Sequence, residues 1–405
     1  MPICMHASAG PLLGRKFTFD GHDVLLLERT KAMSPHLAEK EKYVSRMQFL
    51  VEANPPHIRL VDLGNPSGTF VNGKRVTITD LHHHDEVKAG HTYLRVDIPG
   101  SVEVLRPIFL EPSEWEPDQQ PGPATSPTIS PPEVPGYRIE KELGRNLRGA
   151  VYQAISETDG AIVAIKTFVS ALAPAPEQAR KLLKDADALC ELQHPHILPL
   201  HEVGEAYGTF WFVRDCAAGM DIGSMIKERG KLDEKIAVRI IMQVLSALEH
   251  AHEHGFGHGH LTPSNVFLDE QGDKKRTVKV ADFGLSHCYS VSPVSGLTLT
   301  VPGACLEYMA PERVSVVREI TADGDQFSAA AILYRMLTDR PPYDVTPTIP
   351  LLSRLLEGAI VPLRQRRHEL DPKLAAVVEQ ALAREPAERY QDVKAFAAAL
   401  LPFAK

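Results

Sequence analysis

Short apolar or alternating runs, separated by turn residues, characterise the first hundred residues of the chain. The runs cover residues 17–19, 24–27, 48–51, 57–61 and 93–96. Clusters rich in Gly, Pro and Asn interrupt them, for example at 52–56 and 64–68. Short runs with frequent turns are typical of strands in two packed antiparallel sheets. We therefore expect an all-β sandwich over residues 1–105.

The pattern of apolar and polar residues changes at residue 137. Three strand-like runs come first, at 137–143, 150–154 and 161–167. Apolar residues then recur with the period of a helix, at 179–192, 234–254, 325–337 and 374–383. A small β-rich lobe followed by a larger helical lobe predicts a two-lobed α+β domain over residues 137–402.

The segment between the two domains has its own composition. Residues 111–135 contain 8 of the 32 prolines and five acidic residues, without a single Lys or Arg. A stretch with so few apolar residues cannot bury enough surface to offset the entropy cost of ordering. We expect an extended, proline-rich acidic linker over residues 106–136.

Charge and cysteine content narrow the class of protein. The 405 residues include 44 Lys and Arg against 52 Asp and Glu, a formal net charge of −8. This balance argues against nucleic acid or an anionic membrane surface as the main partner. No apolar run approaches the ~18 residues of a membrane helix, and the five Cys residues form no CxxC pair. Such cysteines are typical of reduced thiols, so we expect a cytoplasmic protein; its oligomeric state stays open.

Three loops of the N-terminal domain carry groups suited to an anion. Arg29 follows one strand, Ser45 and Arg46 open another, and residues 65–73 form a long turn. Arginine offers a planar fork of donors, and hydroxyl and backbone N–H groups can complete the shell around a phosphate dianion. In order and spacing these loops resemble those of a forkhead-associated (FHA) domain, over about residues 8–98.

The resemblance implies that this domain binds a phosphothreonine-containing protein. Arg29, Ser45 and Arg46 would hold the phosphate. Ser67 would occupy the position where the family has an Asn that holds the peptide backbone, and Asn72 would brace the loop.

The N-terminal domain also departs from the FHA pattern. Glu28 replaces a Gly, Gln48 replaces the structural His, and Ser67 replaces the Asn. Glu28 places a negative charge beside a site for dianions, which weakens phosphate binding. Two hypotheses therefore stand for this domain, namely retained phosphopeptide binding and a degenerate interaction module.

Five motifs follow one another in the C-terminal domain. They are the hairpin at 143–152, Val163-Ala164-Ile165-Lys166, the segment 258–265, Ala281-Asp282-Phe283-Gly284 and Met309-Ala310-Pro311-Glu312. In order and spacing they resemble the signature motifs of bacterial-type Ser/Thr protein kinases, over about residues 137–400. The resemblance implies a kinase fold that binds ATP and Mg²⁺.

The kinase resemblance assigns roles to individual residues. Lys166 would contact the ATP phosphates, and Asn265 and Asp282 would bind the metal. A hairpin with glycines lets backbone N–H groups approach phosphates closely. The remaining nucleotide-binding positions are Gly144 and Gly149 in that hairpin, with Val151 and Ala164 above the adenine and Phe267 below it.

The catalytic positions differ from the family pattern. His260 replaces the catalytic Asp, Thr262 replaces the Lys that steadies the γ-phosphate, and Cys305 replaces a Thr that bonds to both. Two positions around the nucleotide also change. Asp185 occupies the place of the Glu that orients Lys166, and Arg214 occupies the gatekeeper position, where its guanidinium must find a carboxylate or leave the pocket.

The framework positions are kept, including Glu312, which we expect to pair with Arg389. A chain that keeps the framework and metal ligands but loses the transfer residues resembles a pseudokinase in a signal-transduction protein. An alternative is an active Ser/Thr kinase with His260 as the general base, since His is competent near neutral pH. A third hypothesis is an inert adaptor that binds neither nucleotide nor phosphate.

Overall fold

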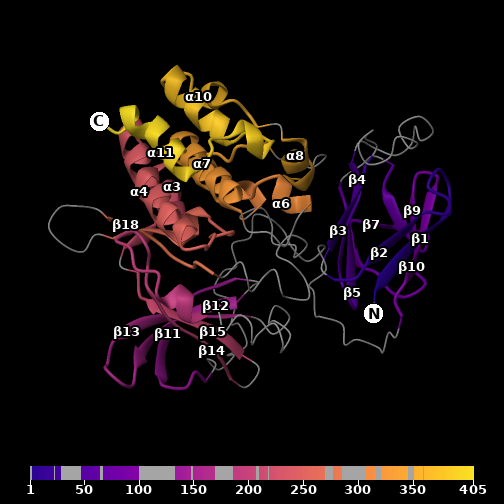
Figure 1. Cartoon of the computed structure of the whole chain (residues 1–405), viewed down its shortest axis with the longest axis horizontal. Helices are drawn as coiled ribbons and strands as arrows, with labels where there is room; N and C mark the ends of the chain where they lie inside the picture. The colour runs from indigo at the N-terminus through magenta and orange to yellow at the C-terminus, as the bar shows by residue number, and fades with distance from the viewer. Residues whose placement is uncertain are drawn as a thin grey trace.

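The computed structural model describes residues 2–21, 23–28, 47–63, 67–99, 133–146, 149–168, 186–206, 209–217, 219–269, 277–284, 306–315, 321–344, 351–358 and 360–405. Within these ranges the chain folds as a β-sandwich followed by a two-lobed α+β domain (Figure 1). This is the fold class that the sequence predicts.

The N-terminal domain consists of two antiparallel sheets. In the described residues, one sheet has the strand order β2-β1-β10-β9-β6-β7 and the other β3-β4-β5-β8. The strands are β1 (Ile3–Ala9), β2 (Lys16–Phe19), β3 (Asp23–Glu28), β4 (Met47–Asn54), β5 (His57–Asp62), β6 (Thr69–Val71), β7 (Lys74–Val76), β8 (Ile78–Asp80), β9 (Glu86–Ala89) and β10 (Thr92–Asp97).

Alternating side chains from both sheets form the sandwich core. Leu25 and Leu27 on β3 and Phe49 and Val51 on β4 point into it, opposite Leu94 on β10. The five predicted runs fall on β2, β3, β4, β5 and β10, and these predictions are confirmed. The sequence did not predict β1 or β6–β9, most of which have only three or four residues and therefore show little periodicity.

The smaller lobe of the C-terminal domain is a five-stranded antiparallel sheet. Its order is β11-β12-β13-β15-β14. The strands are β11 (Tyr137–Asn146), β12 (Gly149–Ser156), β13 (Ile162–Phe168), β14 (Leu200–Ala206) and β15 (Thr209–Asp215). The three predicted strands are confirmed as β11–β13. Val134 is 4% exposed and packs with Ile165 and Trp211, so packing on this sheet begins inside the segment predicted as linker.

The larger lobe is helical. Its helices are α3 (Ile222–Arg229), α4 (Glu234–Glu253), α6 (Glu312–Ser315), α7 (Ala322–Thr338), α8 (Leu351–Glu357), α9 (Leu363–Arg366), α10 (Pro372–Ala381) and α11 (Val393–Leu400). Short 3-10 turns add η3 (Pro263–Asn265), η4 (Leu306–Tyr308), η5 (Pro386–Glu388) and η6 (Leu401–Phe403). No helix in the described part of the chain is long and apolar enough to cross a membrane.

Helix ends and burial follow from the sequence. Asp233 caps α4 by accepting from the N–H groups of Lys235 and Ile236, and Thr321 caps α7 by accepting from Gly324 N–H. Most of α7 is buried on all sides, because its Ala329-Ala330-Ala331 segment lets neighbouring helices approach closely.

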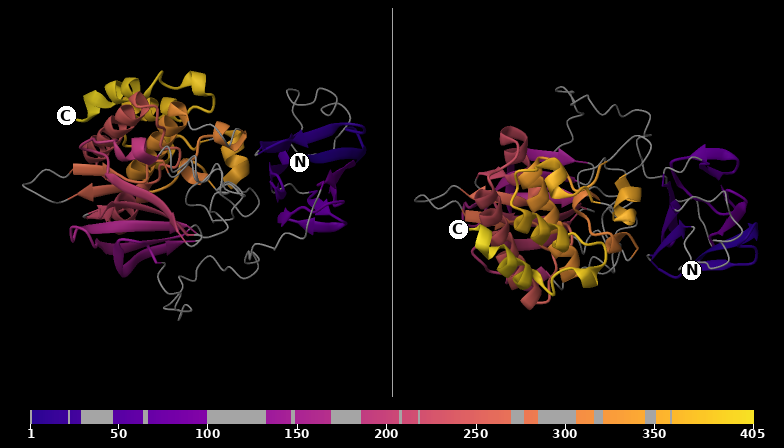
Figure 2. Two further views of the ribbon diagram at one scale, coloured as in Figure 1. Left: turned by 60° about the horizontal axis from the view of Figure 1, so that its bottom comes forward. Right: turned by 90° about the horizontal axis from the view of Figure 1, so that it is seen from above.

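The candidate site lies between the two lobes. A three-stranded sheet, β16 (Met220–Asp221), β17 (Val266–Asp269) and β18 (Thr277–Val280), is positioned between the helices and the five-stranded sheet (Figure 2). The loop after α4 enters η3 just before β17, and Asp282 follows β18. The N–H of Ala281 donates to the carbonyl of Asn265 at 2.8 Å, which holds these two segments side by side.

Candidate active site

Lys166, Asn265 and Asp282 meet at one carboxylate. The Nζ atom of Lys166 donates to Oδ2 of Asp282 at 2.6 Å, and Nδ2 of Asn265 donates to the same oxygen at 2.9 Å. Lys166 comes from the small lobe, and the other two residues come from segments next to β17 and β18. The structure thus brings together the predicted phosphate-binding lysine and the two predicted metal ligands.

Arg214 is the fourth member of this cluster. On β15 it pairs across the sheet with Ala164 of β13, so both side chains point to the face that carries the nucleotide-binding positions. Its Nε atom lies 3.3 Å from Oδ1 of Asp282 as an ion pair, and its guanidinium lies over the ring of Phe267 at 5.6 Å. Arg214 is 7% exposed, so the gatekeeper guanidinium stays in the pocket and has found a carboxylate.

Two cations therefore share the Asp282 carboxylate. Burial by itself would raise the pKa of Asp282, but the Lys166 ammonium and the Arg214 guanidinium outweigh that effect and hold the pKa well below its ordinary value. The carboxylate is ionised at neutral pH. Its backbone has a φ of 71°, a left-handed conformation that non-glycine residues adopt mainly at turns and functional sites.

The loop before η3 is fixed by a buried aspartate. Oδ2 of Asp325 on α7 accepts from the N–H of His258 at 2.7 Å, and Oδ1 accepts from the N–H of Gly259 at 2.7 Å. His252 also contacts Asp325 Oδ2 at 2.9 Å, and the buried ring of His258 bonds to the carbonyl of Ala281 at 3.0 Å. These contacts set the position of the residue that follows, His260.

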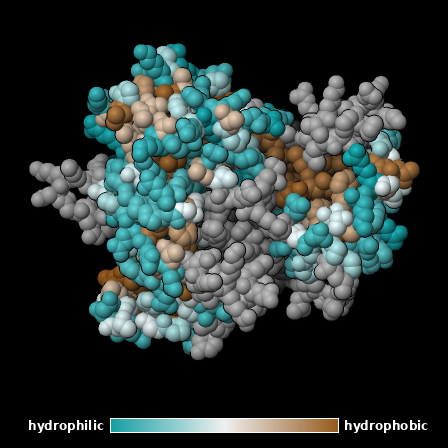
Figure 3. All heavy atoms as spheres, in the orientation of Figure 1, coloured by the Kyte–Doolittle hydropathy of each residue, from teal (hydrophilic) through white to brown (hydrophobic). Residues whose placement is uncertain are grey.

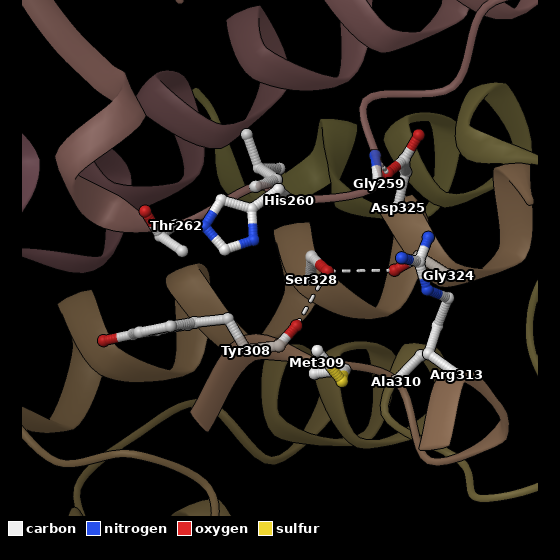
Figure 4. A pocket seen from close by; sticks show the side chains of 11 residues that line it. Gly259, His260, Thr262, Tyr308, Met309, Ala310, Arg313, Gly324, Asp325 and Ser328 are labelled. Atoms are coloured by element: carbon white, nitrogen blue, oxygen red, sulfur yellow. Dashed lines mark hydrogen bonds between the residues drawn. The ribbon is translucent and has the colours of Figure 1, made fainter. Parts of the chain in front are cut away.

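His260 and Thr262 line a small pocket next to the cluster (Figure 4). Figure 4 shows the His260 ring pointing into this pocket, across from Tyr308. Thr262 turns to Asn265 instead of outward. Its hydroxyl donates to Asn265 Oδ1 at 2.5 Å and its N–H donates to the same oxygen at 3.2 Å. A family lysine at this position would offer a long cation, whereas Thr262 offers a short hydroxyl that is already bonded.

The predicted nucleotide-binding hairpin is β11–β12. Its last pair of residues is Asn146 and Gly149, and a Cβ atom on Gly144 would meet nothing within 4 Å, so its backbone is open to a close approach. Val151 is half-buried and Ala164 is 1% exposed. These residues lie on adjacent strands of one sheet. Asp185 and Cys305 lie outside the described residues.

The residue types around Asp282 suit Mg²⁺, but their present bonds compete with it. Carboxylate and amide oxygens are the ligands that Mg²⁺ prefers. Oδ2 of Asp282 accepts from Lys166 and Asn265, Oδ1 faces Arg214, and Oδ1 of Asn265 accepts from Thr262. The donor set therefore fits the ion in kind, and a divalent cation must displace protein donors to reach it.

The FHA-like site is described only in part. Arg29, Ser45 and Arg46 lie outside the described residues. Ser67 is exposed at the start of the turn before β6. Asn72 joins two loops, because its Nδ2 donates to Asp85 Oδ1 at 2.7 Å and its Oδ1 accepts from the N–H of Glu86 at 2.9 Å.

Gln48, which replaces the structural His of the FHA pattern, has a clear position. It is 0% exposed, and its Nε2 donates to the carbonyl of Gly68 at 3.1 Å and contacts Thr69 Oγ1 at 3.3 Å. Thr69 in turn donates to Asp62 Oδ2 at 2.6 Å. Gln48 thus braces the turn that begins at Ser67.

Sequence reasoning missed two functional contacts. The bond from Thr262 to Asn265 has a recognisable signal, because Thr-x-x-Asn is a spacing at which a side chain can bond back to a turn. For Arg214 the sequence indicates the need for a carboxylate but not that Asp282 supplies it, since these residues are far apart in the sequence. The predicted pair of Glu312 and Arg389 is confirmed, with two bonds of 2.7 Å.

Comparisons with known proteins agree with this fold. The chain matches the protein kinase domain family over residues 137–400 and the FHA domain family over residues 13–90. Serine/threonine-protein kinase PknF of Mycobacterium tuberculosis is 31% identical over 268 residues, which are 65% of this chain and 56% of the relative. Probable serine/threonine-protein kinase PknB of Lactococcus lactis is 31% identical over 259 residues, 64% of this chain but 40% of the relative.

Solved structures show the same fold. The kinase domain of Mycobacterium tuberculosis PknI has a TM-score of 0.53 and 27% identity, and the match covers 67% of this chain and 98% of that one. Rad53 residues 1–466, crystallised with AMP-PNP, has a TM-score of 0.53 over 100% of both chains at 19% identity, which shows a shared fold alone. The chain belongs to the protein kinase family and carries an FHA domain ahead of its kinase domain.

Proposed function

We propose that this chain is a cytoplasmic phospho-signalling protein in which the FHA domain binds a phosphothreonine-containing partner. Its kinase domain binds ATP weakly and transfers phosphate very slowly, as a pseudokinase. The presence of FHA and kinase domains together supports phospho-signalling. The observation that carries the finer proposal is the network of contacts around Asp282 and Asn265, in which Arg214 forms an ion pair with Asp282 and Thr262 donates a hydrogen bond to Asn265.

The nucleotide would use residues that the chain retains. Lys166, which donates to Asp282 Oδ2, would contact the ATP phosphates. A Cβ atom on Gly144 would meet nothing within 4 Å, which leaves room for phosphates beside the hairpin backbone. When bound, Mg²⁺ would neutralise charge on the phosphates, held by Asp282 and Asn265. Arg214 opposes this step because it places a second positive charge on the Asp282 carboxylate.

Phosphoryl transfer depends on positioning and electrostatics, so the replaced residues matter most for rate. Thr262 supplies no cation for the γ-phosphate, because its side chain is neutral, and its hydroxyl is already engaged with Asn265. His260 points into the neighbouring pocket (Figure 4). Losing the lysine and the orienting Asp together costs several kcal/mol of barrier, at ~1.4 kcal/mol per tenfold in rate.

An active Ser/Thr kinase is the second candidate. His260 is a competent general base near neutral pH, and the transition state of phosphoryl transfer asks little of a base. The resemblance to bacterial kinases is equally compatible with this reading.

Radiolabelled phosphoryl transfer from Mg²⁺-ATP to a general acceptor separates the two candidates. A pseudokinase gives almost no product, and His260→Asp with Thr262→Lys and Cys305→Thr gives more product than His260→Asp alone. Ordinary kinase turnover by the wild type, abolished in Lys166→Met, would establish the active kinase. A thermal shift with ATP, run with Mg²⁺ and with EDTA, tests nucleotide binding. The absence of any shift at millimolar ATP would favour the inert adaptor.

Calorimetry with matched phosphothreonine and unphosphorylated peptides tests the FHA proposal. Only the phosphorylated peptide should bind, and Arg29→Ala should weaken it by about 1.5–3 kcal/mol, as for a charge-assisted hydrogen bond. Equal affinity for both peptides would establish the degenerate interaction module instead.

A further inference from the structure

Part of the outward face of one FHA sheet is apolar, where a two-sheet sandwich normally meets water. In such sandwiches inward apolar residues alternate with outward polar residues along each strand. Along β4, Phe49 and Val51 belong to the sandwich core, yet Leu50 between them is also 0% exposed. Strand β4 is therefore covered on both faces.

Leu50 belongs to a row of apolar side chains that crosses this sheet. The antiparallel register pairs Leu26 with Leu50, Leu50 with Val61, and Val61 with Ile78. Residues paired in this way point to the same side of a sheet. The next row on the same face is mostly charged, with Glu52, Arg59 and Asp80, and Arg59 donates to Asp80 at 2.6 Å.

The helical lobe of the kinase domain covers Leu26, Leu50 and Val61 of this apolar row. Leu50 and Leu63 belong to the same continuous cluster of buried side chains as Tyr308, Ala310 and the core of the helical lobe, and Val24, Leu26 and Val61 pack against that cluster. Strand β3 contacts helix α6. Figures 1 and 2 show the sandwich beside α6 and α8 in every view, and Figure 3 shows hydrophobic residues gathered at this junction.

We propose that the outward face formed by Leu26, Leu50, Val61 and Leu63 is an intramolecular docking surface for the helical lobe at α6. The occupant is this chain's own kinase domain, because its buried side chains continue the apolar cluster without a break. An exposed apolar face of this kind is unfavourable in water and favours a partner. Because the two domains belong to one chain, each is at a high effective concentration for the other, so a small contact suffices.

The docking site on the kinase domain is anchored by a buried ion pair. Helix α6 begins at Glu312, whose carboxylate forms two bonds of 2.7 Å with the fully buried side chain of Arg389. It directly follows Tyr308 and Ala310, which line the pocket of His260. Docking therefore places the FHA domain next to the segment that borders the catalytic loop.

Small-angle X-ray scattering of the intact chain tests the proposal, with light scattering to confirm a monomer. The wild type should scatter as one compact particle. Leu50→Asp should enlarge the radius of gyration and the maximum dimension, because a buried carboxylate opposes docking. Leu13→Asp is the matched control, since Leu13 is 68% exposed on the sandwich, and it should scatter like the wild type.

A second measurement keeps the test decisive if Leu50→Asp unfolds the sandwich. Leu26→Asp changes a half-buried position of the same row. In hydrogen exchange it should accelerate the amides of residues 312–315 by about tenfold or more, with circular dichroism unchanged. The proposal is overturned if the wild type scatters as two independently moving domains, if folded Leu26→Asp leaves exchange at 312–315 unaltered, or if the face pairs with a second copy.

Discussion

At the scale of single residues, Arg214 changes the chemistry of the kinase domain most. A buried guanidinium requires a carboxylate, and in the described part of the site it takes Asp282, which the family uses for metal. The aromatic ring of Phe267 adds a cation–π contact. Arg214 thus stabilises the Asp282 carboxylate itself. It also reduces the free energy that would be gained when a metal cation binds there.

Replacing Arg214 should therefore tighten binding of the metal–nucleotide complex. Arg214→Thr removes the competing charge and leaves Lys166 on Asp282, so we expect affinity for Mg²⁺-ADP to rise by at least about tenfold, or ~1.4 kcal/mol. Titration with a fluorescent nucleotide analogue, with Mg²⁺ and with EDTA, measures the effect. Arg229→Thr, at an exposed position on α3, is the control and should change nothing. An unchanged or weaker affinity in Arg214→Thr contradicts the competing role.

Asp282→Asn should destabilise the kinase domain through the same cluster. The substitution leaves two largely buried cations without their carboxylate, and breaking a buried pair costs about 3–5 kcal/mol. Urea unfolding followed through the fluorescence of buried Trp211 measures the loss. Adding Arg214→Met to Asp282→Asn should recover part of it. Strictly additive effects of the two substitutions would show that the residues are not coupled.

At the scale of elements, short pieces are held by side chains from distant segments. Helix α6 has only four residues, too few to be stable alone, and Arg389 holds it through Glu312. Gln48 on β4 likewise holds the turn at Gly68. The sequence marks these elements weakly because their stability comes from tertiary contacts.

The Glu312–Arg389 pair should contribute far more to the free energy of unfolding than an exposed ion pair in the same domain. Arg389 has a side chain that is 0% exposed, so Glu312→Gln should lower the free energy of unfolding by about 3 kcal/mol. The matched control is Lys231→Met, which breaks a 2.9 Å pair with Glu369 whose side chains are 53% and 47% exposed. We expect less than about 1 kcal/mol there. Similar losses in both variants, measured by urea unfolding, would contradict this ranking.

At the scale of the whole molecule, both domains contain partly buried histidines that favour the neutral form. Burial lowers the pKa of His57 in the FHA domain and of His196 in the kinase domain below the ordinary value. At mildly acidic pH the unfolded chain therefore binds more protons than the folded chain does. Stability is lost as the pH falls below about 6.5, the pKa of an unperturbed histidine.

The free energy of unfolding should decrease from pH 7.5 to pH 5.5 in both domains. Each histidine contributes a slope of at most about 1.4 kcal/mol per pH unit. In His196→Gln, the slope of the free energy of unfolding against pH should become smaller for the kinase domain and stay unchanged for the FHA domain. Urea titrations at several pH values measure both slopes. A kinase slope that does not respond to His196→Gln would contradict this assignment.

The sequence by itself determined the two-domain order, the sandwich strands around Leu25 and Phe49, and the motif residues Lys166, Asn265 and Asp282. These depend on local periodicity and on spacing along the chain, which a sequence displays directly. The replacement of the family's catalytic residues by His260 and Thr262 was visible for the same reason.

Only the tertiary structure decided which side chains face one another. The ion pair of Arg214 with Asp282, the turn held by Gln48 and the burial of Leu50 against the helical lobe join segments that are distant in sequence. Partners of this kind are selected by burial, since a desolvated charge or amide must be paired and an apolar face must be covered. Local sequence patterns do not show which distant residue becomes the partner.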